Sequence, residues 1–351
     1  MSFYKNKRVF ITGHTGFKGS WLVTILKREG AIITGYSLNP PTNPSLFDVA
    51  NVADGITSII GDVRDFDSLK RAFDEAQPEI VMHLAAQPIV RDSYRIPRET
   101  YETNVMGTVN ILECVRLSKT VKSFLNVTTD KVYENNEVGV AFTEDMPLDG
   151  YDPYSNSKSC SELVTHSYKS SFFADGRVAI STARAGNVIG GGDFAPDRII
   201  PDCVRAVLSN ATLKLRNPNS TRPYQHVLEP LFAYLEICKK QYEDNSFAGY
   251  YNVGPLERDC LTTGELVSCF DKAWGGLNYV YENDNGPHEA NFLKLDCKKI
   301  REVLGVEPCW TAQTAVEKVC QWSKVYMEKG DLNKVMNDQI EEYEKLFRKE
   351  K

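Results

Sequence analysis

The sequence predicts an α/β fold in which a doubly wound parallel sheet is followed by a smaller C-terminal α/β lobe. Short apolar runs alternate with helix-length segments through the first half of the 351-residue chain, and a glycine-rich loop follows the first run directly. Repeated strand, helix and strand units indicate a parallel sheet with right-handed crossovers. After residue 188 the sequence becomes rich in Gly and Pro and its later elements are irregularly spaced, which indicates a second lobe.

Six apolar runs are predicted strands, because each is short and continuous, as strands buried on both faces are. They are residues 8–13, 31–37, 58–62, 79–86, 124–129 and 179–188. The segments between them have the lengths of crossover helices, and helices are predicted at 20–29, 67–76, 100–118 and 154–173.

The second half begins at the stretch IGGGDFAPDRIIPD, so we divide the chain into residues 1–188 and 189–351. The run YYNVG at 250–254 is expected to be one more strand that can return to the first sheet, which would interleave the two parts. The segment 331–351 has apolar residues on one face, as an amphipathic helix does. For this helix we favour packing on its own chain over a subunit contact.

The composition excludes several classes of protein. Apolar residues at 42% and charged residues at 25% are typical of a soluble globular protein, and a net charge of −6 argues against a nucleic-acid binder. The N-terminus has no signal-peptide pattern, and no apolar run reaches the roughly 18 residues of a membrane span. The nine cysteines form no CxxC pair, which indicates reduced thiols. We therefore expect a cytoplasmic protein without a metal site.

The loop FITGHTGFKGSW predicts a dinucleotide site of the Rossmann type. Gly13, Gly16 and Gly19 stand three apart between the first predicted strand and a helix. One glycine makes the tight turn, one lets the backbone approach a pyrophosphate, and one lets the helix lie close to the strand. The free N–H groups of the helix N-terminus then face the phosphates.

NAD is the expected cofactor, with NADP less favoured. The second predicted strand ends in Tyr36 and Ser37, with no carboxylate for a ribose hydroxyl and no obvious Arg for a 2′-phosphate, although Lys18 could move near one. Asp62 is placed either to bind an adenine amine or to cap a strand end. The expected cofactor contacts are Gly13, Thr15, Gly16, Phe17, Lys18, Gly19, Asp62, Val63, Leu84, Ala85, Ala86, Gln87, Asn104, Tyr154 and Lys158.

Tyr154 and Lys158 form a predicted catalytic pair, because they are four residues apart on one face of a helix. An ammonium near a phenol favours the phenolate. A phenolate can take the proton of a hydroxyl as hydride leaves its carbon, and Thr129 at a strand end can share that hydrogen bond. The spacing alone is a weak signal, but it follows a glycine loop and five predicted strands.

Together these motifs resemble the extended short-chain dehydrogenase/reductase family. The similar stretches are the glycine loop, HLAAQ, TNVMGT, TTDK and YDPYSNSK. Within that family, GHTGFKGSWL, YSLNPPTNPSLF, TTDKVYEN, RAGNVIGGGD and GPHEANFLKLD resemble the sugar-nucleotide 4,6-dehydratases of the CDP-sugar branch. Dehydratases of other nucleotides have Glu where this chain has Lys131. The likeness covers nearly the whole chain and leaves out about the last twenty residues.

The resemblance implies a lyase that converts CDP-D-glucose to CDP-4-keto-6-deoxy-D-glucose with bound NAD that is regenerated in each cycle. The implied catalytic residues are Thr129, Asp130, Lys131, Tyr154 and Lys158. Oxidation at C4 makes the C5 proton acidic, and loss of the C6 hydroxyl then needs a base at C5 and an acid at O6. By analogy Asp130 is the acid and Lys131 the base, but which group does which job stays open.

The expected substrate contacts lie mostly in the second lobe, because planar guanidinium groups there suit a diphosphate. They are Asn187, Arg198, Arg216, Arg222, Tyr224, His226, His288 and Glu289. For Arg216 and His226 the alternative is a purely structural role. The choice of cytosine as the base of the substrate rests on the resemblance alone. His83, in a predicted buried strand, is expected to be a core histidine.

The sequence leaves two alternatives to the dehydratase. A nucleotide-sugar 4-epimerase needs no acid/base pair beside Thr129, so Asp130 and Lys131 argue against it. A non-catalytic nucleotide sensor would be expected to have lost Tyr154 or Lys158. The expected partners are a small nucleotide sugar and further copies of this chain, because related proteins pair through helices like 100–118 and 154–173.

Overall fold

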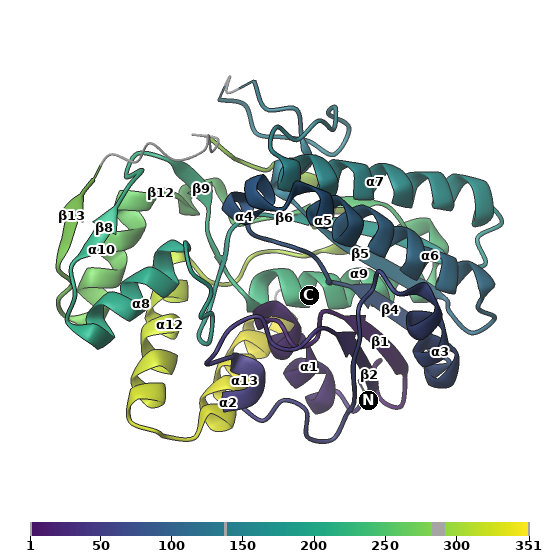
Figure 1. Cartoon of the computed structure of the whole chain (residues 1–351), viewed down its shortest axis with the longest axis horizontal. Coiled ribbons are helices and arrows are strands. Elements are labelled where there is room, and N and C mark those ends of the chain that lie inside the picture. Colours follow the sequence, from purple (N-terminus) through teal and green to yellow (C-terminus); the bar gives the residue numbers. More distant parts are fainter. Residues whose placement is uncertain (1, 137–138, 283–291, 350–351) are drawn as a thin grey trace.

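The computed structural model describes residues 2–136, 139–282 and 292–349, and Figure 1 shows them as a layered α/β body with a lobe on one side. The body is built on a seven-stranded sheet with the order β11-β6-β5-β4-β1-β2-β3, and every neighbouring pair is parallel. The strands are β1 (Arg8–Thr12), β2 (Ile32–Ser37), β3 (Thr57–Ile60), β4 (Ile80–His83), β5 (Ser123–Thr129), β6 (Ala179–Ala185) and β11 (Tyr250–Val253). The predicted doubly wound sheet and the return of the 250–254 run to it are therefore confirmed.

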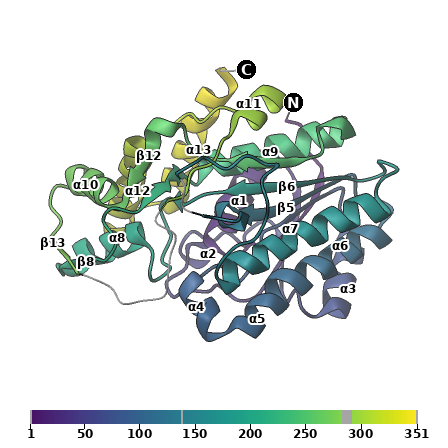
Figure 2. The ribbon, with the colours of Figure 1, turned by 90° about the horizontal axis from the view of Figure 1, so that it is seen from above.

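Two helical layers cover the sheet because its strands are apolar on both faces. Along β1, Val9 and Ile11 point into one core cluster and Phe10 into the other, as alternation along a strand requires. The first cluster includes residues of α1 (Phe17–Arg28), α9 (Leu228–Glu243) and α13 (Leu332–Lys349). The second includes residues of α3 (Phe66–Ala76) and α6 (Gly107–Leu117) and is flanked by α7 (Pro153–Phe172), which lies beside α6 in Figure 2.

The predicted helix at 100–118 is continuous in space but changes its winding. It runs through α5 (Pro97–Tyr101), a π-helical turn η1 (Glu102–Met106) and α6. A π turn inserts one residue into the helical ladder and is often found at functional sites. Here the turn carries Asn104, which is buried.

The lobe has a small core of its own between α8 (Ile199–Ser209), α10 (Thr263–Trp274) and α12 (Ala312–Met327). The lobe also contains short pairs of strands. These are β7 (Val188–Ile189) with β10 (Gln225–His226), β9 (Thr221–Pro223) with β12 (Cys260–Thr262), and β8 (Leu213–Leu215) with β13 (Tyr279–Tyr281). The remaining short helices are α2 (Leu46–Val49), α4 (Val90–Arg95), η2 (Asp130–Val132), η3 (Asn245–Phe247), η4 (Glu257–Asp259) and α11 (Lys298–Leu304).

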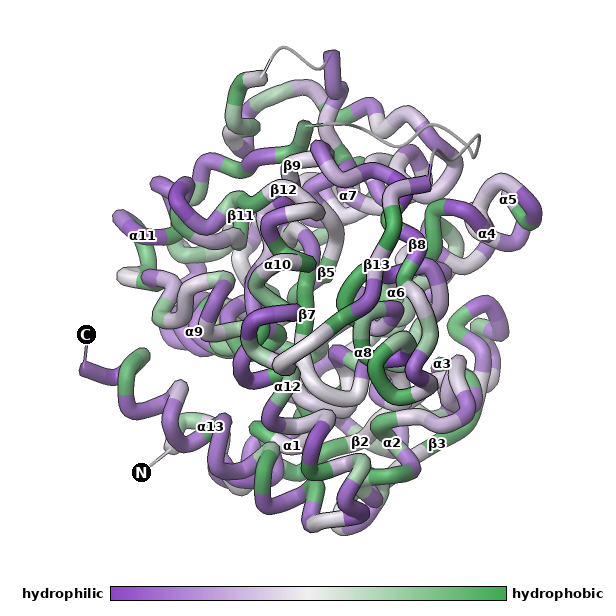
Figure 3. The backbone as a smooth tube through the Cα atoms, turned by 90° about the vertical axis from the view of Figure 1, so that its left-hand side faces the viewer, coloured by the Kyte–Doolittle hydropathy of each residue, from purple (hydrophilic) through white to green (hydrophobic). Residues whose placement is uncertain are grey.

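The C-terminal helix α13 packs on its own chain, as we favoured. Hydrophobic and hydrophilic residues alternate along it in Figure 3, and Met336, Ile340 and Tyr343 are buried in the core that also holds α1 and α9. Within the described ranges, no helix combines the length and apolar character that a membrane span requires.

Candidate active site

The glycine loop between β1 and α1 leaves no room for side chains at two of its glycines. Gly13 has φ +80°, and a Cβ there would lie 2.8 Å from the backbone nitrogen of Ala85. A Cβ on Gly19 would lie 2.2 Å from the carbonyl oxygen of Gly13. Both positions therefore require glycine, which keeps α1 close to β1 and β4.

The N-terminus of α1 is free to receive an anion. Gly16 caps the helix without a side-chain hydrogen bond, and a Cβ there would meet nothing closer than 3.4 Å. Free N–H groups at a helix start attract phosphate oxygens. The absence of a side chain at Gly16 and the helix start without a side-chain cap together fit the pyrophosphate of a dinucleotide.

The strand ends beside this loop are fixed by polar side chains. Thr12 Oγ1 accepts hydrogen bonds of 3.2 Å from the backbone N–H groups of Leu84 and Ala85. The amide of Asn104 binds both the N–H and the carbonyl of Gln87, at 2.8 and 3.1 Å, and donates to Ser157 Oγ at 2.8 Å. Asn104 thus joins the end of β4 to α7, which is a structural task in addition to the cofactor contact that we expected.

At the expected adenosine end, the polar side chains are already engaged with one another. Thr15 Oγ1 lies 2.9 Å from Ser37 Oγ and donates to the carbonyl of Leu38. The carboxylate of Asp62, just after β3, is paired with Arg64 at 2.6 Å. Asp62 is partly exposed there, so both the adenine contact and the strand-end cap remain predictions.

The expected catalytic residues meet at the carboxyl end of β5 and the start of α7. Thr129 Oγ1 donates to Asp130 Oδ1 at 2.9 Å, and Lys131 Nζ lies 3.5 Å from the same oxygen. The side chain of Asp130 is 1% exposed and that of Lys131 is 23% exposed, so the pair is no exposed loop salt bridge. The other oxygen of Asp130 is buried without a hydrogen-bond partner among the described residues.

The environment of Tyr154 and Lys158 shifts both of their pKa values. Burial raises the pKa of Tyr154 to about 12, while the hydroxyl of Thr129 acts in the opposite direction. Burial lowers the pKa of Lys158 to about 8, and its Nζ donates to the carbonyl of Val127 at 3.0 Å. Asp152 caps the first turn of α7 by accepting from Ser155 N at 3.0 Å, which fixes where the helix begins.

Two further cations lie near this group. Lys18 Nζ is 3.4 Å from the hydroxyl of Tyr234 on α9, and burial together with the charges of Arg198 and Lys158 lowers the pKa of Lys18 to about 7. Arg198, at the start of α8, is paired with Asp193 at 3.0 Å. The Lys18 side chain therefore lies at the reacting end, near Lys158 and Asp130.

The remaining expected substrate residues are spread over the lobe. Asn187 follows β6, where its carbonyl accepts from Gln225 N at 3.0 Å, and Arg222 is buried on β9. Arg216 pairs with Asp197 at 3.0 Å beside a cavity of about 510 Å³ that also touches Asp202. His288 and Glu289 lie outside the described residues.

Two of these residues lie in packed surroundings. Tyr224 is buried in the lobe core with its hydroxyl 3.2 Å from Thr263 Oγ1. The ring of His226 lies between Trp21 and Trp310, with centroid distances of 5.9 and 4.8 Å, and burial lowers its pKa to about 3. This placement favours the structural alternative for His226.

Sequence reasoning missed a buried ion pair behind the catalytic residues. Glu162 on α7 and Arg184 on β6 lie 2.9 Å apart, with 1% and 3% of their side chains exposed. The only local signal was the position of Glu162 one helical turn after Lys158. His83 is the core histidine that we expected, since Thr12 Oγ1 and Thr108 Oγ1 lie 2.7 and 3.3 Å from its ring nitrogens.

The chain is similar to known proteins over most of its length. The family model described as GDP-mannose 4,6 dehydratase matches residues 10–321. A CDP-glucose 4,6-dehydratase of Salmonella typhimurium is 44% identical over 349 residues, which are 97% of each chain. A dTDP-glucose 4,6-dehydratase of Escherichia coli is 26% identical over 90% of this chain and 93% of its own.

Solved structures share the fold. A dTDP-glucose 4,6-dehydratase of Bacillus anthracis in complex with NAD has a TM-score of 0.78 at 23% identity, over 93% of this chain and 99% of its own. A UDP-glucose 4-epimerase of Thermus thermophilus in complex with NAD has a TM-score of 0.79 at 25% identity, over 90% and 99% of the two chains.

Proposed function

The chain belongs to the GDP-mannose 4,6 dehydratase family, and from that membership we propose that it is a CDP-glucose 4,6-dehydratase. The reaction removes water from CDP-D-glucose and gives CDP-4-keto-6-deoxy-D-glucose, so the enzyme is a hydro-lyase. The observation that carries the proposal is the full-length similarity to the Salmonella enzyme of that name.

NAD is the cofactor, and when bound it accepts hydride from C4 of the sugar and supplies the hydride that reaches C6. Residues 1–188 hold it, with the glycine loop and the N-terminus of α1 at its pyrophosphate. Residues 189–351 form the substrate-binding part, with β11 contributed to the first sheet. Arg198 and Arg222 are the cations that we assign to the diphosphate of the substrate.

Tyr154 removes the proton from the O4 hydroxyl of the sugar. Its phenol must ionise for this step. The charge of Arg198 favours the phenolate, and we assign the same effect to Lys158, one helical turn further along α7. Thr129 orients the same hydroxyl through its own oxygen. Lys158, whose Nζ donates to the carbonyl of Val127 at 3.0 Å, is the residue that we assign to both the cofactor and the activation of Tyr154.

Asp130 and Lys131 carry out the elimination across C5 and C6. Lys131, as the neutral amine, takes the C5 proton, and Asp130, as the acid, gives a proton to O6 so that water leaves. Lys131 then returns its proton to C5, and the proton that Tyr154 took from O4 replaces the one lost by Asp130. Because Lys131 Nζ lies 3.5 Å from Asp130 Oδ1, one proton transfer from Lys131 to Asp130 reaches the reactive state without changing the net charge.

The proposal is tested by turnover of glucose linked to CDP, dTDP, UDP or GDP, with the product mass as the readout. Loss of one water from CDP-glucose alone is the expected result. Loss of water from another nucleotide would keep the mechanism and overturn the substrate. An unchanged mass with inverted C4 would mean a 4-epimerase, the activity named for the Thermus structure.

The assembly and setting of the enzyme are part of the proposal. We expect a cytoplasmic homo-oligomer, a dimer or a tetramer, that supplies a deoxysugar for a surface glycan such as lipopolysaccharide O-antigen. Leu117 on α6 and Leu163 and Phe172 on α7 are 47%, 54% and 47% exposed, which suits a contact between copies along these helices. Light scattering of the Leu163→Glu variant tests this, because loss of the oligomer is the expected result.

A further inference from the structure

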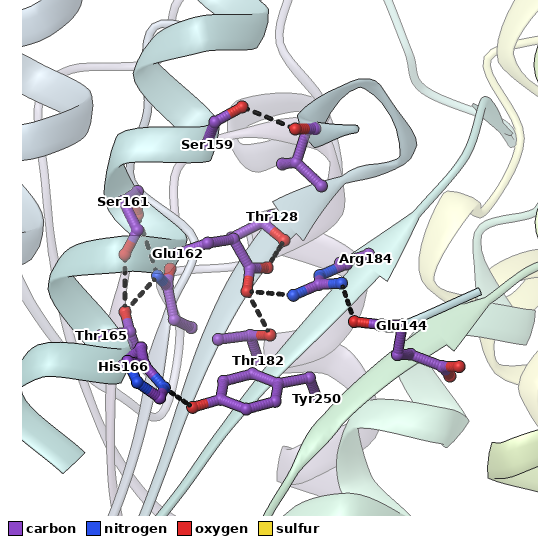
Figure 4. A network of polar contacts seen from close by, with 12 residues as sticks. Thr128, Glu144, Ser159, Ser161, Glu162, Thr165, His166, Thr182, Arg184 and Tyr250 are labelled. Carbon is purple, nitrogen blue, oxygen red and sulfur yellow. Dashed lines mark hydrogen bonds and ion pairs between the residues drawn. The ribbon is translucent and has the colours of Figure 1, made fainter. Parts of the chain in front are cut away.

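The face of α7 that lies on the sheet is polar, although helices that cover a parallel sheet usually pack through apolar side chains. Ser161 Oγ and Thr165 Oγ1 both accept from the amide of Asn126 on β5, at 2.9 Å each (Figure 4). Glu162 stands between them and is 1% exposed. Hydrogen bonds of fixed length and direction therefore set how α7 lies on the sheet.

Glu162 is the centre of this polar layer. One carboxylate oxygen accepts from Thr128 Oγ1 at 2.5 Å, and the other accepts from Thr182 Oγ1 at 2.8 Å and Arg184 Nη2 at 2.9 Å (Figure 4). The guanidinium of Arg184 also donates to the hydroxyl of Tyr133 at 2.9 Å. A single ion pair thus links α7, β5, β6 and the segment after η2.

Several residues of this network are close neighbours of a catalytic residue in the chain. Thr128 precedes Thr129, Tyr133 follows Lys131 by two residues, and Glu162 follows Lys158 by one helical turn. A buried ion pair contributes little net stability, because an apolar pair of the same volume is often as stable or more stable. A role in placing and charging the catalytic group accounts for the pair better than stability does.

We propose that Glu162 is a positioning residue, which holds α7 in line with the end of β5 and favours the charged form of Lys158 one helical turn away, while Arg184 pairs with it from the sheet side. This rests on the catalytic role of Lys158 in the proposed function. Burial lowers the pKa of Lys158, and the negative charge of Glu162 opposes that shift.

His83, Lys18 and Tyr154 also lie near Lys158, and they do not supply the negative charge that Glu162 supplies. His83 on β4 is neutral, because burial lowers its pKa to about 3. Lys18 on α1 supplies no negative charge, and burial together with the charges of Arg198 and Lys158 lowers its pKa to about 7. Tyr154 is neutral in the resting site, because burial raises its pKa to about 12. The acidic group that favours a charged Lys158 is Glu162.

The test is the Glu162→Gln variant, which keeps the shape of the side chain and removes its charge. We expect the alkaline limb of the kcat/KM profile to move to lower pH by about one unit, as loss of a nearby opposite charge predicts. The same shift is expected in the pH dependence of NADH binding, followed by the fluorescence of the four tryptophans, which needs no turnover.

The matched control is Thr182→Val, which removes one hydrogen bond to the same carboxylate and leaves its charge. It is expected to lower Tm without moving the alkaline limb of the kcat/KM profile or the pH dependence of NADH binding. If Glu162→Gln does not fold, the double variant Glu162→Gln/Arg184→Met removes both charges and should fold. The proposal is overturned if the variant that folds binds NADH with the pH dependence of the parent. An inactive parent would instead contradict the proposed function, and the NADH measurement would still decide the role of Glu162.

Discussion

At the scale of single residues, the reacting end is a set of groups whose charges are controlled by burial. Tyr154 is held protonated, Lys158 is close to losing its proton, and Asp130 has one oxygen with no hydrogen-bond partner among the described residues. Such an arrangement suits proton exchange with a substrate that completes the missing contacts. The individual roles can be separated by substitution.

Replacing Tyr154 with Phe removes the phenol that is proposed to take the O4 proton. We expect kcat to fall about 10²- to 10⁴-fold, the usual contribution of a general base, while Tm changes little. Steady-state turnover of CDP-glucose measures the loss. The control is Tyr151→Phe, because Tyr151 is 80% exposed and should keep the parent rate. An active Tyr154→Phe protein would show that another group removes the proton.

Replacing Lys131 with Ala removes the proposed base at C5. In deuterated water the parent should place deuterium at C5 of the product, whereas the variant should form the C4 ketone without exchange or elimination. Mass spectrometry of the sugar measures both steps. Exchange at the parent rate in Lys131→Ala would assign the base to Asp130 or to another group.

At the scale of elements, the approach of α1 to β1 depends on the absence of a side chain at Gly19. A Cβ there would lie 2.2 Å from the Gly13 carbonyl, so Gly19→Ala must move the helix start. We expect a loss of about 1–3 kcal/mol of stability, typical of overpacking, and weaker NAD binding. Urea unfolding and NADH titration measure the two effects.

Gly249→Ala, outside the glycine loop, is the control for Gly19→Ala, because a Cβ at Gly249 would have no neighbour closer than 3.6 Å. It should leave the free energy of unfolding and the affinity for NADH at the parent values. If Gly19→Ala bound NADH as tightly as the parent, the glycine loop would not be the site of the pyrophosphate.

The elements also show what the sequence could and could not predict. Strand positions were predictable because apolar runs such as 79–86 are continuous, and β4 lies within that run. The π turn at Glu102–Met106 was not, since its residues have the same helical pattern as their neighbours and only the bonds of Asn104 require the extra residue. The ion pair of Glu162 and Arg184 joins residues 22 positions apart on separate elements, so no local motif marks it.

At the scale of the whole molecule, Glu229 ties the C-terminal segment to helix α9. Its carboxylate accepts from Trp310 N at 2.7 Å and from the hydroxyl of Tyr343 on α13 at 2.5 Å. Burial raises its pKa to about 7, although these hydrogen bonds act in the opposite direction. This particular hydrogen bond could not be predicted, because Glu229 and Tyr343 lie 114 residues apart and no local motif joins them.

This raised pKa makes stability depend on pH. The folded state favours protonated Glu229, so its contribution is complete below the unfolded value and is lost as pH rises through about 7. We therefore expect a lower Tm at pH 8.5 than at pH 6.0, and a smaller difference in Glu229→Gln. Differential scanning calorimetry at the two pH values measures this, and an equal difference in both proteins would show that another group is responsible.

The central claim is that one active site oxidises C4, eliminates water and delivers the same hydride to C6. The most direct test uses CDP-glucose that carries deuterium at C4, incubated with the enzyme and NAD and followed by NMR of the product. The account predicts that the deuterium appears in the C6 methyl group and that no labelled NADH accumulates. Deuterium that stays at C4 of an inverted sugar would contradict it and identify a 4-epimerase instead.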